Sequence, residues 1–137
     1  MTDAEMLRAG IRRDLLARLD SRAHCLVHDV QTESLARSAS ITRSAAGIRL
    51  AAQRVRDPVV AIGSAPTALE EALRLAGEQA WRPRLIIGIP VGFVGVEEAK
   101  RRLVEHEEIP FITSLGRKGG TAVTAAVVNA LLERAVR

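Results

Sequence analysis

The sequence predicts a single α/β domain built around a mainly parallel sheet. Its 137 residues are enough for one domain and too few for two ordinary ones. Short apolar runs alternate with amphipathic segments along the chain, which is typical of parallel strands joined by helices. Three of the apolar runs end in loops rich in glycine or hydroxyl residues. Such loops at strand ends are where open α/β sheets bind ligands.

Four short apolar runs predict strands, and longer segments with apolar residues at helical spacing predict helices. The expected strands are Ala23–Val30, Val59–Ile62, Leu85–Ile89 and Ile109–Thr113. The expected helices are Ala4–Leu19, Glu33–Ala39, Ser44–Val55, Ala68–Ala76, a segment opening at Glu97, and Thr121–Val136. Thr42 is placed to cap the third helix, and Pro66 and Gly77 bracket the fourth as helix ends commonly require.

The composition limits the classes of partner. A formal net charge of +4 favours an anionic ligand. Only 2% of the residues are aromatic and the arginines are scattered, so we expect no nucleic-acid partner. No apolar run reaches the roughly 18 residues of a membrane span, and no signal peptide is evident near Met1, so we expect no membrane association. Cys25 is the only cysteine, which excludes an internal disulfide and predicts a reducing, cytoplasmic location.

The titratable residues predict neither a metal site nor a catalytic group. On a strand, His24 and His28 would share one face and Cys25 would point away, which argues against zinc. His106 lies in a charged helix end and is expected to be solvated. No nucleophile with a partner base can be assigned, so the sequence identifies no catalytic residue. The loops match neither the dinucleotide fingerprint nor the Walker A pattern, so a dinucleotide site is poorly supported.

The loop after each of the last three strands has two interpretations. Ser64 and Thr67 either cap the helix that follows, which their position favours, or bind a carboxylate or phosphate. Gly92 and Gly95 either allow a ligand close to the backbone, with Phe93 stacked on a flat conjugated ring, or form a tight turn with Phe93 packed inside.

Cations accompany two of the predicted helix starts. Arg117 and Lys118, beside Gly119 and Gly120, predict an anion site in preference to a solvated turn. Arg43 opens the Ser44–Val55 helix, where a cation opposes the helix dipole. It is either an exposed residue of little consequence or a functional one.

Several segments, taken together, resemble the precorrin-8X methylmutase family, whose members include the cobalt-precorrin-8 enzymes. In the family's order and spacing, the chain contains Thr2-Asp3-Ala4-Glu5-Met6, Thr42-Arg43-Ser44-Ala45-Ala46, Val59-Val60-Ala61-Ile62-Gly63-Ser64-Ala65-Pro66-Thr67, Gly88-Ile89-Pro90-Val91-Gly92-Phe93-Val94-Gly95 and Gly116-Arg117-Lys118-Gly119-Gly120. The match covers essentially all of residues 1–137, as one domain. Ser64 stands where asparagine is common.

The resemblance implies a three-layer flavodoxin-like fold with helices on both faces of the sheet, and a homodimer. It implies a cofactor-free isomerase of cobalamin biosynthesis that moves a methyl group from C-11 to C-12 of a tetrapyrrole to form hydrogenobyrinate. The substrate is precorrin-8X or cobalt-precorrin-8, a polycarboxylate. Arg43 and Arg117 would then bind carboxylates and Phe93 would pack near the ring. Ser64, Thr67, Gly92, Gly119 and Gly120 would donate hydrogen bonds or permit close approach.

The family's proposed proton donor is a histidine that precedes the Asp-Ala-Glu-Met motif, and this sequence begins at that motif. We therefore expect the family's first strand to be largely missing and the catalytic histidine to be absent. A late start assignment, a split gene and a shortened paralogue would each account for this. The alternative to the isomerase is a catalytically inactive corrinoid-binding or assembly protein. A generic nucleotide-binding flavodoxin-like domain is a third, weaker hypothesis.

Overall fold

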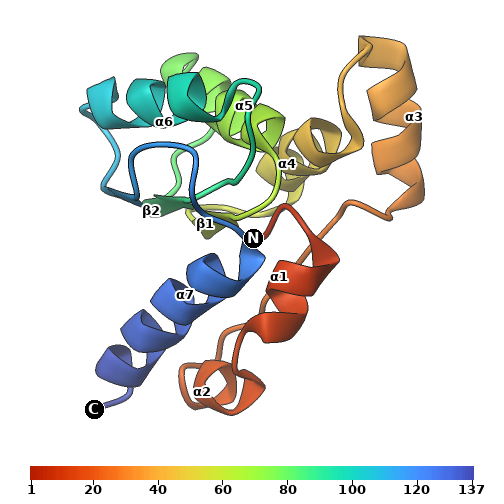
Figure 1. Ribbon diagram of the computed structural model, residues 1–137. Coiled ribbons are helices and arrows are strands. Elements are labelled where there is room, and N and C mark those ends of the chain that lie inside the picture. Colours follow the sequence, from red (N-terminus) through yellow and green to blue (C-terminus); the bar gives the residue numbers. More distant parts are fainter.

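The computed structural model describes residues 1–137 as a three-layer α/β sandwich (Figure 1). The central sheet contains β1 (Val59–Ile62), β2 (Leu85–Gly88) and β3 (Phe111–Thr113), which are parallel and lie in the order β1-β2-β3. The helices α4 (Arg43–Arg54), α5 (Pro66–Gly77) and α6 (Val96–Glu105) cover one face. The other face carries α1 (Glu5–Gly10), α2 (Arg13–Arg18) and α7 (Thr121–Ala135), while α3 (Val30–Ala39) packs outside α4. The predicted architecture is confirmed.

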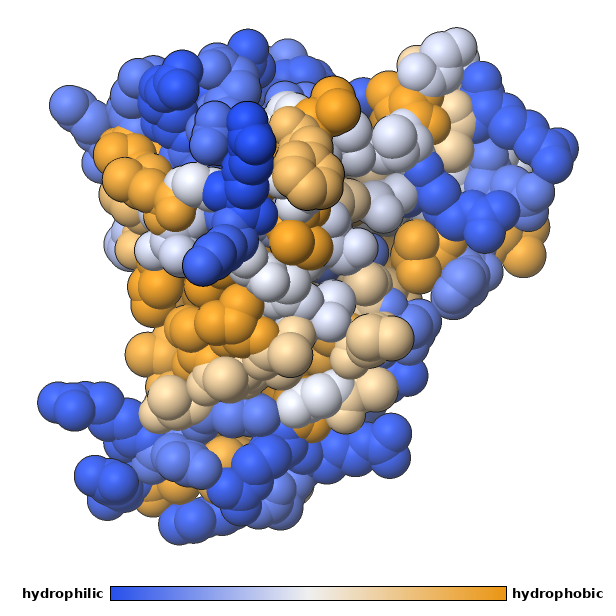
Figure 2. All heavy atoms as spheres, in the orientation of Figure 1, coloured by the Kyte–Doolittle hydropathy of each residue, from blue (hydrophilic) through white to orange (hydrophobic).

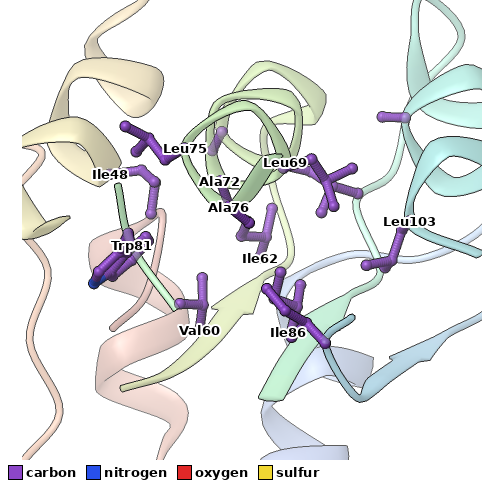
Figure 3. Packing of buried hydrophobic residues seen from close by; sticks show 14 of the residues in the cluster. Ile48, Val60, Ile62, Leu69, Ala72, Leu75, Ala76, Trp81, Ile86 and Leu103 are labelled. Atoms are coloured by element: carbon purple, nitrogen blue, oxygen red, sulfur yellow. The ribbon is translucent and has the colours of Figure 1, made fainter. Parts of the chain in front are cut away.

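The alternation of side chains along the strands divides the core between the two faces. Val60, Ile62 and Ile86 point toward α4, α5 and α6, where they pack with Leu69, Trp81 and Leu103 in a buried cluster (Figure 3). The neighbouring residues Ala61 and Ile87 point the other way and pack with Leu7 and Ala125 of α1 and α7. Because side chains alternate with a period of two, short strands buried on both faces are continuously apolar, as these are.

The prediction of a strand at Ala23–Val30 is wrong. Residues 23–29 form no strand, and within them only Cys25 makes a β-bridge. Polar groups of this segment accept hydrogen bonds from the first residues of α3 instead. The side chain of Asp29 accepts a hydrogen bond from the backbone N–H of Gln31, and the carbonyl of Leu26 accepts one from the hydroxyl of Thr32. Asp29 is therefore the N-cap of α3, and a cap residue ends an extended segment.

Thr2 takes up the position next to β1. It forms parallel bridges with both Ala61 and Cys25, and the N–H of Ala61 donates to the carbonyl of Met1 at 2.8 Å. The sheet therefore continues beyond β1 through single-residue bridges.

The predicted helix Ala4–Leu19 is divided into α1 and α2. Asn129 of α7 accommodates the break: its side-chain oxygen accepts from the N–H of Arg12 (2.9 Å) and its amide nitrogen donates to the carbonyl of Gly10 (3.0 Å). Gly10 also lets α1 approach α7, since a Cβ at this position would lie 3.1 Å from the Cβ of Ala125. The remaining helices and strands are confirmed within a few residues of their predicted bounds. No helix has the length and apolar character needed to cross a membrane.

Candidate functional site

The predicted loops meet at the carboxyl edge of the sheet because all three strands run in the same direction. Contacts between the loops are direct. A Cβ on Gly63, after β1, would lie 3.0 Å from the carbonyl oxygen of Gly120, which precedes α7. A Cβ on Gly95, after β2, would lie 4.0 Å from the Cβ of Pro66 at the start of α5. The start of α4 joins them, since the hydroxyls of Thr42 and Thr67 are 2.8 Å apart.

The loop after β1 already holds a carboxylate of this chain. The N–H of Gly63 donates to Oδ1 of Asp3 at 3.0 Å, and the N–H groups of Ser64 and Ala65 donate to Oδ2 at 2.9 and 2.7 Å. Asp3 is only 2% exposed. Burial raises the pKa of its carboxyl, against the opposing effect of the three backbone hydrogen bonds. The favoured interpretation, in which Ser64 or Thr67 caps the helix, is wrong, because the N-cap of α5 is Ala65 and no side chain caps this helix. Asp3 occupies the backbone amides of the alternative anion site, and the exposed hydroxyl of Ser64 remains as a predicted ligand-binding group.

The loop after β2 presents apolar side chains and free backbone donors. Phe93 is 84% exposed, so its ring is not packed inside, and Val94 beside it is 90% exposed. Gly92 has a φ of 140°, which favours glycine, and its N–H donates to the carbonyl of Arg117 at 3.4 Å. The N–H groups of Phe93, Val94 and Gly95 donate no hydrogen bond within the protein.

The loop after β3 carries the cations. The guanidinium carbon of Arg117 lies 5.7 Å from the ring centroid of Phe93, a cation–π distance, so this arginine bridges two of the loops. Glu97 is its only carboxylate neighbour, at 3.7 Å. Lys118 is exposed and makes no side-chain ion pair. The N–H groups of Arg117, Lys118 and Gly119 are unpaired within the protein.

The local backbone geometry requires glycine at two positions of this loop. A Cβ on Gly119 would collide with the backbone carbonyl oxygens of Ile89 and Pro90. Gly120 has a φ of 124°, and its N–H donates to the carbonyl of Ile89 at 2.9 Å. These glycines permit the close approach of two loops, while their neighbours supply the free N–H groups.

Arg43 is exposed at the first position of α4, and Thr42 is confirmed as its cap, accepting from the N–H of Ala45 at 3.1 Å. No carboxylate is paired with Arg43. The N–H groups of Arg43 and Ser44 are also unpaired within the protein. Because Thr42 contacts Thr67, this cationic helix start borders the same edge as the three loops.

The edge therefore combines unpaired N–H groups, three cationic side chains and an exposed aromatic ring. Free N–H groups at loop nests and helix starts bind carboxylates and phosphates, and the cations add a favourable field. In Figure 2, strongly hydrophilic atoms lie directly beside apolar ones in the region where Figure 1 draws these loops. Such a surface suits a flat apolar ligand whose periphery carries negative charge.

His24 and His106 lie away from this edge. His24 lines a hollow of about 750 Å³, which opens at the opposite end of the sheet beside Val59, Leu85 and Leu132. His106 caps the far end of α6. Its side chain is only partly solvated, because the residue is half-buried and its Nε2 atom is enclosed without a hydrogen-bond partner. No cluster of histidine, cysteine and carboxylate side chains could hold a metal ion.

Comparison with known proteins identifies the family and supports the fold. The family model described as precorrin-8X methylmutase matches residues 1–134. The chain belongs to the precorrin-8X methylmutase family. The chain is 43% identical over 132 residues to a precorrin-8X methylmutase of Sinorhizobium sp, and 39% identical over 132 residues to a cobalt-precorrin-8 methylmutase of Methanocaldococcus jannaschii. In both comparisons 96% of the chain is matched.

Solved structures of the family superpose closely on this chain. A precorrin-8X methylmutase related protein, 42% identical, gives a TM-score of 0.90 and covers 97% of this chain and 69% of its own. The enzyme from Thermus thermophilus, 34% identical, gives 0.86 and covers 98% and 65%. The chain spans 62% and 59% of the lengths of the Sinorhizobium and Methanocaldococcus relatives.

The sequence analysis does not identify two residues that shape this edge, Asp3 and Lys100. Asp3 belongs to a motif that carries the family resemblance, yet nothing in its neighbours indicates three distant backbone partners. Lys100, in α6, is fully buried and donates to the carbonyls of Gly116 and Lys118. Its only signal in the sequence is rarity, because the chain has two lysines among its 20 basic residues.

Proposed function

We propose that this chain acts in cobalamin biosynthesis as an isomerase of the precorrin-8X methylmutase type, moving a methyl group from C-11 to C-12 of a tetrapyrrole to give hydrogenobyrinate. The observation that carries the proposal is the edge itself: unpaired N–H groups and cations surround an exposed ring in a chain of this family. A polycarboxylate macrocycle has this combination of an apolar face and a charged rim. Residues 1–137 would form one domain with this role.

The proposed roles follow from the exposure of each group. Arg117 and Arg43 bind peripheral carboxylates, and Phe93 packs on the macrocycle. The hydroxyls of Ser64 and Thr67 donate hydrogen bonds, while Gly92, Gly119 and Gly120 keep the backbone close to the ligand. A methyl shift within one molecule needs no co-substrate. The protein's task is to hold the ring in one orientation, exclude water and stabilise the charge that develops.

A second candidate function is a corrinoid-binding or assembly protein without catalysis. The specific observation in its favour is that neither His24 nor His106 lies at the carboxyl edge. Both functions require binding at the same edge, and only the first requires turnover.

We also propose a homodimer in the cytoplasm. Large apolar side chains are exposed at several places besides Phe93 and Val94, including Met6, Val30 and Leu115. Cys25 is a free thiol. Sedimentation equilibrium of the purified chain tests the dimer.

The test of the function is a titration with hydrogenobyrinate, followed by the absorption of the macrocycle, and then a methyl-shift assay with precorrin-8X. We expect saturable binding that Arg117→Ala weakens by about tenfold or more, the value of one charged contact. Arg101→Ala, which removes an exposed cation of α6 paired with Glu98, is the matched control and should bind normally. Binding with turnover supports the isomerase, and binding without turnover supports the second candidate. Absence of binding refutes both.

A further inference from the structure

Lys100 is an unusual residue for its position. It lies in the middle of α6, is 0% exposed and is among the largest fully buried side chains. Lysine is rarely buried to this extent unless it is paired. Yet no carboxylate lies within ion-pair distance of Lys100, whereas twelve ion pairs occur elsewhere. A packing role alone would be served better by leucine or methionine, so the ammonium itself needs an explanation.

The partners of the ammonium supply that explanation. Nζ donates to the carbonyl of Gly116 at 2.8 Å and to the carbonyl of Lys118 at 2.7 Å. These two carbonyls flank Arg117, whose own carbonyl accepts from the N–H of Gly92. Three successive carbonyls are thus turned inward and bound. The N–H groups of Arg117, Lys118 and Gly119 are left without partners inside the protein.

The choice of lysine agrees with this geometry. The chain uses arginine at 18 of its 20 basic positions, and both lysines belong to this region, one beneath the loop and one within it. A compact ammonium on a flexible stem can donate to two converging carbonyls, whereas a planar guanidinium is wider and donates in a fixed fork. Burial lowers the pKa of Lys100, and the nearby carboxylate of Glu97 opposes this effect.

We propose that Lys100 is a positioning residue that fixes the 114–120 loop, and with it the guanidinium of Arg117, in the geometry that binds the anionic rim of the macrocycle. The inference rests on the proposed function for the identity of the ligand. The fixation of the loop does not depend on it.

Limited trypsin digestion tests the fixation without any ligand. Trypsin cleaves after Arg117 and Lys118, both exposed, and a loop must open to enter the protease. In Lys100→Met, which removes both hydrogen bonds to the loop, we expect cleavage after these two residues to be at least about tenfold faster, the effect of losing even one charged hydrogen bond. Cleavage after Arg22, at the other end of the sheet, should be unchanged and serves as an internal reference. Arg101→Met is the matched control, since it removes one positive charge from the adjacent position of the same helix.

Binding of hydrogenobyrinate tests the consequence. Lys100→Met should weaken binding about as much as Arg117→Ala, and the double variant should lose little more, because both changes disable the same contact. Lys100→Arg, which keeps the charge, should restore part of the affinity, whereas a purely structural role would give no such recovery. Unchanged cleavage and unchanged affinity in Lys100→Met overturn the inference. If the unaltered chain binds no macrocycle, the proposed function fails, and the digestion still decides whether Lys100 fixes the loop.

A measurement on the unaltered chain keeps the inference testable if Lys100→Met does not fold. With only two lysines, ¹⁵N spectra of the side-chain ammonium groups contain two candidates. We expect the protons of Lys100 to exchange with solvent at least roughly tenfold more slowly than those of Lys118, because they are buried and hydrogen-bonded. Equal exchange at the two lysines contradicts the buried contact.

Discussion

Removal of the Asp3 carboxylate is the sharpest test of how the carboxyl edge is built. In Asp3→Ala, three N–H groups lose their acceptor: those of Gly63, Ser64 and Ala65. A hydrogen bond to a charged group contributes about 1.5–3 kcal/mol, so three such bonds set an upper limit of about 4.5–9 kcal/mol. The net effect is smaller, because burial raises the pKa of Asp3 and the anion is therefore costly in this site.

The exposure of the three amides narrows the expected loss in the free energy of unfolding. Gly63 is buried, so its unpaired N–H costs about 1–3 kcal/mol. Ser64 is exposed and Ala65 is half-buried, so water replaces part of their lost bonds. We therefore expect Asp3→Ala to lower the free energy of unfolding by about 2–4 kcal/mol. Asp3→Asn should cost less, since its amide oxygen remains an acceptor.

Urea unfolding followed by the fluorescence of Trp81 measures this change. Trp81 is the only tryptophan and is 5% exposed in the main core, so its emission reports the loss of the whole fold. Asp14→Ala is the matched control, since its carboxylate is exposed and pairs only with Arg12 on the surface. If Asp3→Ala unfolds at the same urea concentration as this control, the three hydrogen bonds do not hold the loop, and the reasoning is refuted.

The other predictions concern helix packing and the loop glycines. Burial would raise the pKa of Glu71, but hydrogen bonds from Arg74 and Arg49 lower it overall, so the carboxylate stabilises the fold above its usual pKa and this stabilisation is lost as pH falls through the lowered pKa. Glu71→Gln should therefore reduce the free energy of unfolding near pH 7 and flatten the acid side of a plot of stability against pH. An unaltered acid side contradicts this. Asn129→Ala should cost about 1–2 kcal/mol in urea unfolding, because two hydrogen bonds to the α1–α2 break are lost; no change would mean that water replaces both. Gly119→Ala should abolish macrocycle binding and destabilise the fold, since its Cβ meets two backbone carbonyls. Gly77→Ala, with nothing within 4 Å, is its control and should be neutral or slightly stabilising in the same titration and urea unfolding experiments.

The elements that the sequence predicts well are those whose signals are local. Val59–Ile62 and Leu85–Ile89 are apolar runs bounded by proline or glycine, and Thr42 precedes a helix that it caps through its own hydroxyl. The failures occur where distant side chains decide. Residues 23–29 have the composition of a strand, but the cap at Asp29 commits the following residues to α3.

The candidate site shows the same division. Exposed groups such as Phe93 and Arg117 lie in loops whose position follows from parallel strands, so their meeting could be predicted. Their roles toward a ligand remain predictions. The buried residues Asp3 and Lys100 could not be predicted, because each binds backbone groups at least 16 residues away. A side chain that binds backbone groups requires no particular residue type at the partner positions, so the sequence gives no sign of the pairing.

The buried residues Asp3 and Lys100 place opposite charges beneath different loops of the carboxyl edge, and this constrains how a polyanionic ring can lie on it. Asp3 places a carboxylate against the loop after β1, so the free amides of that helix start are already neutralised. Lys100 places an ammonium beneath the loop after β3, next to Arg117 and Lys118, and leaves three N–H groups of that loop unpaired. Since β1 and β3 lie on opposite sides of β2, the field along the edge becomes more favourable to anions toward β3. Most carboxylates of a bound macrocycle should therefore gather over the loop before α7, with Arg43 binding a further one at the start of α4 and the hydroxyls of Ser64 and Thr67 facing a less charged part of the rim.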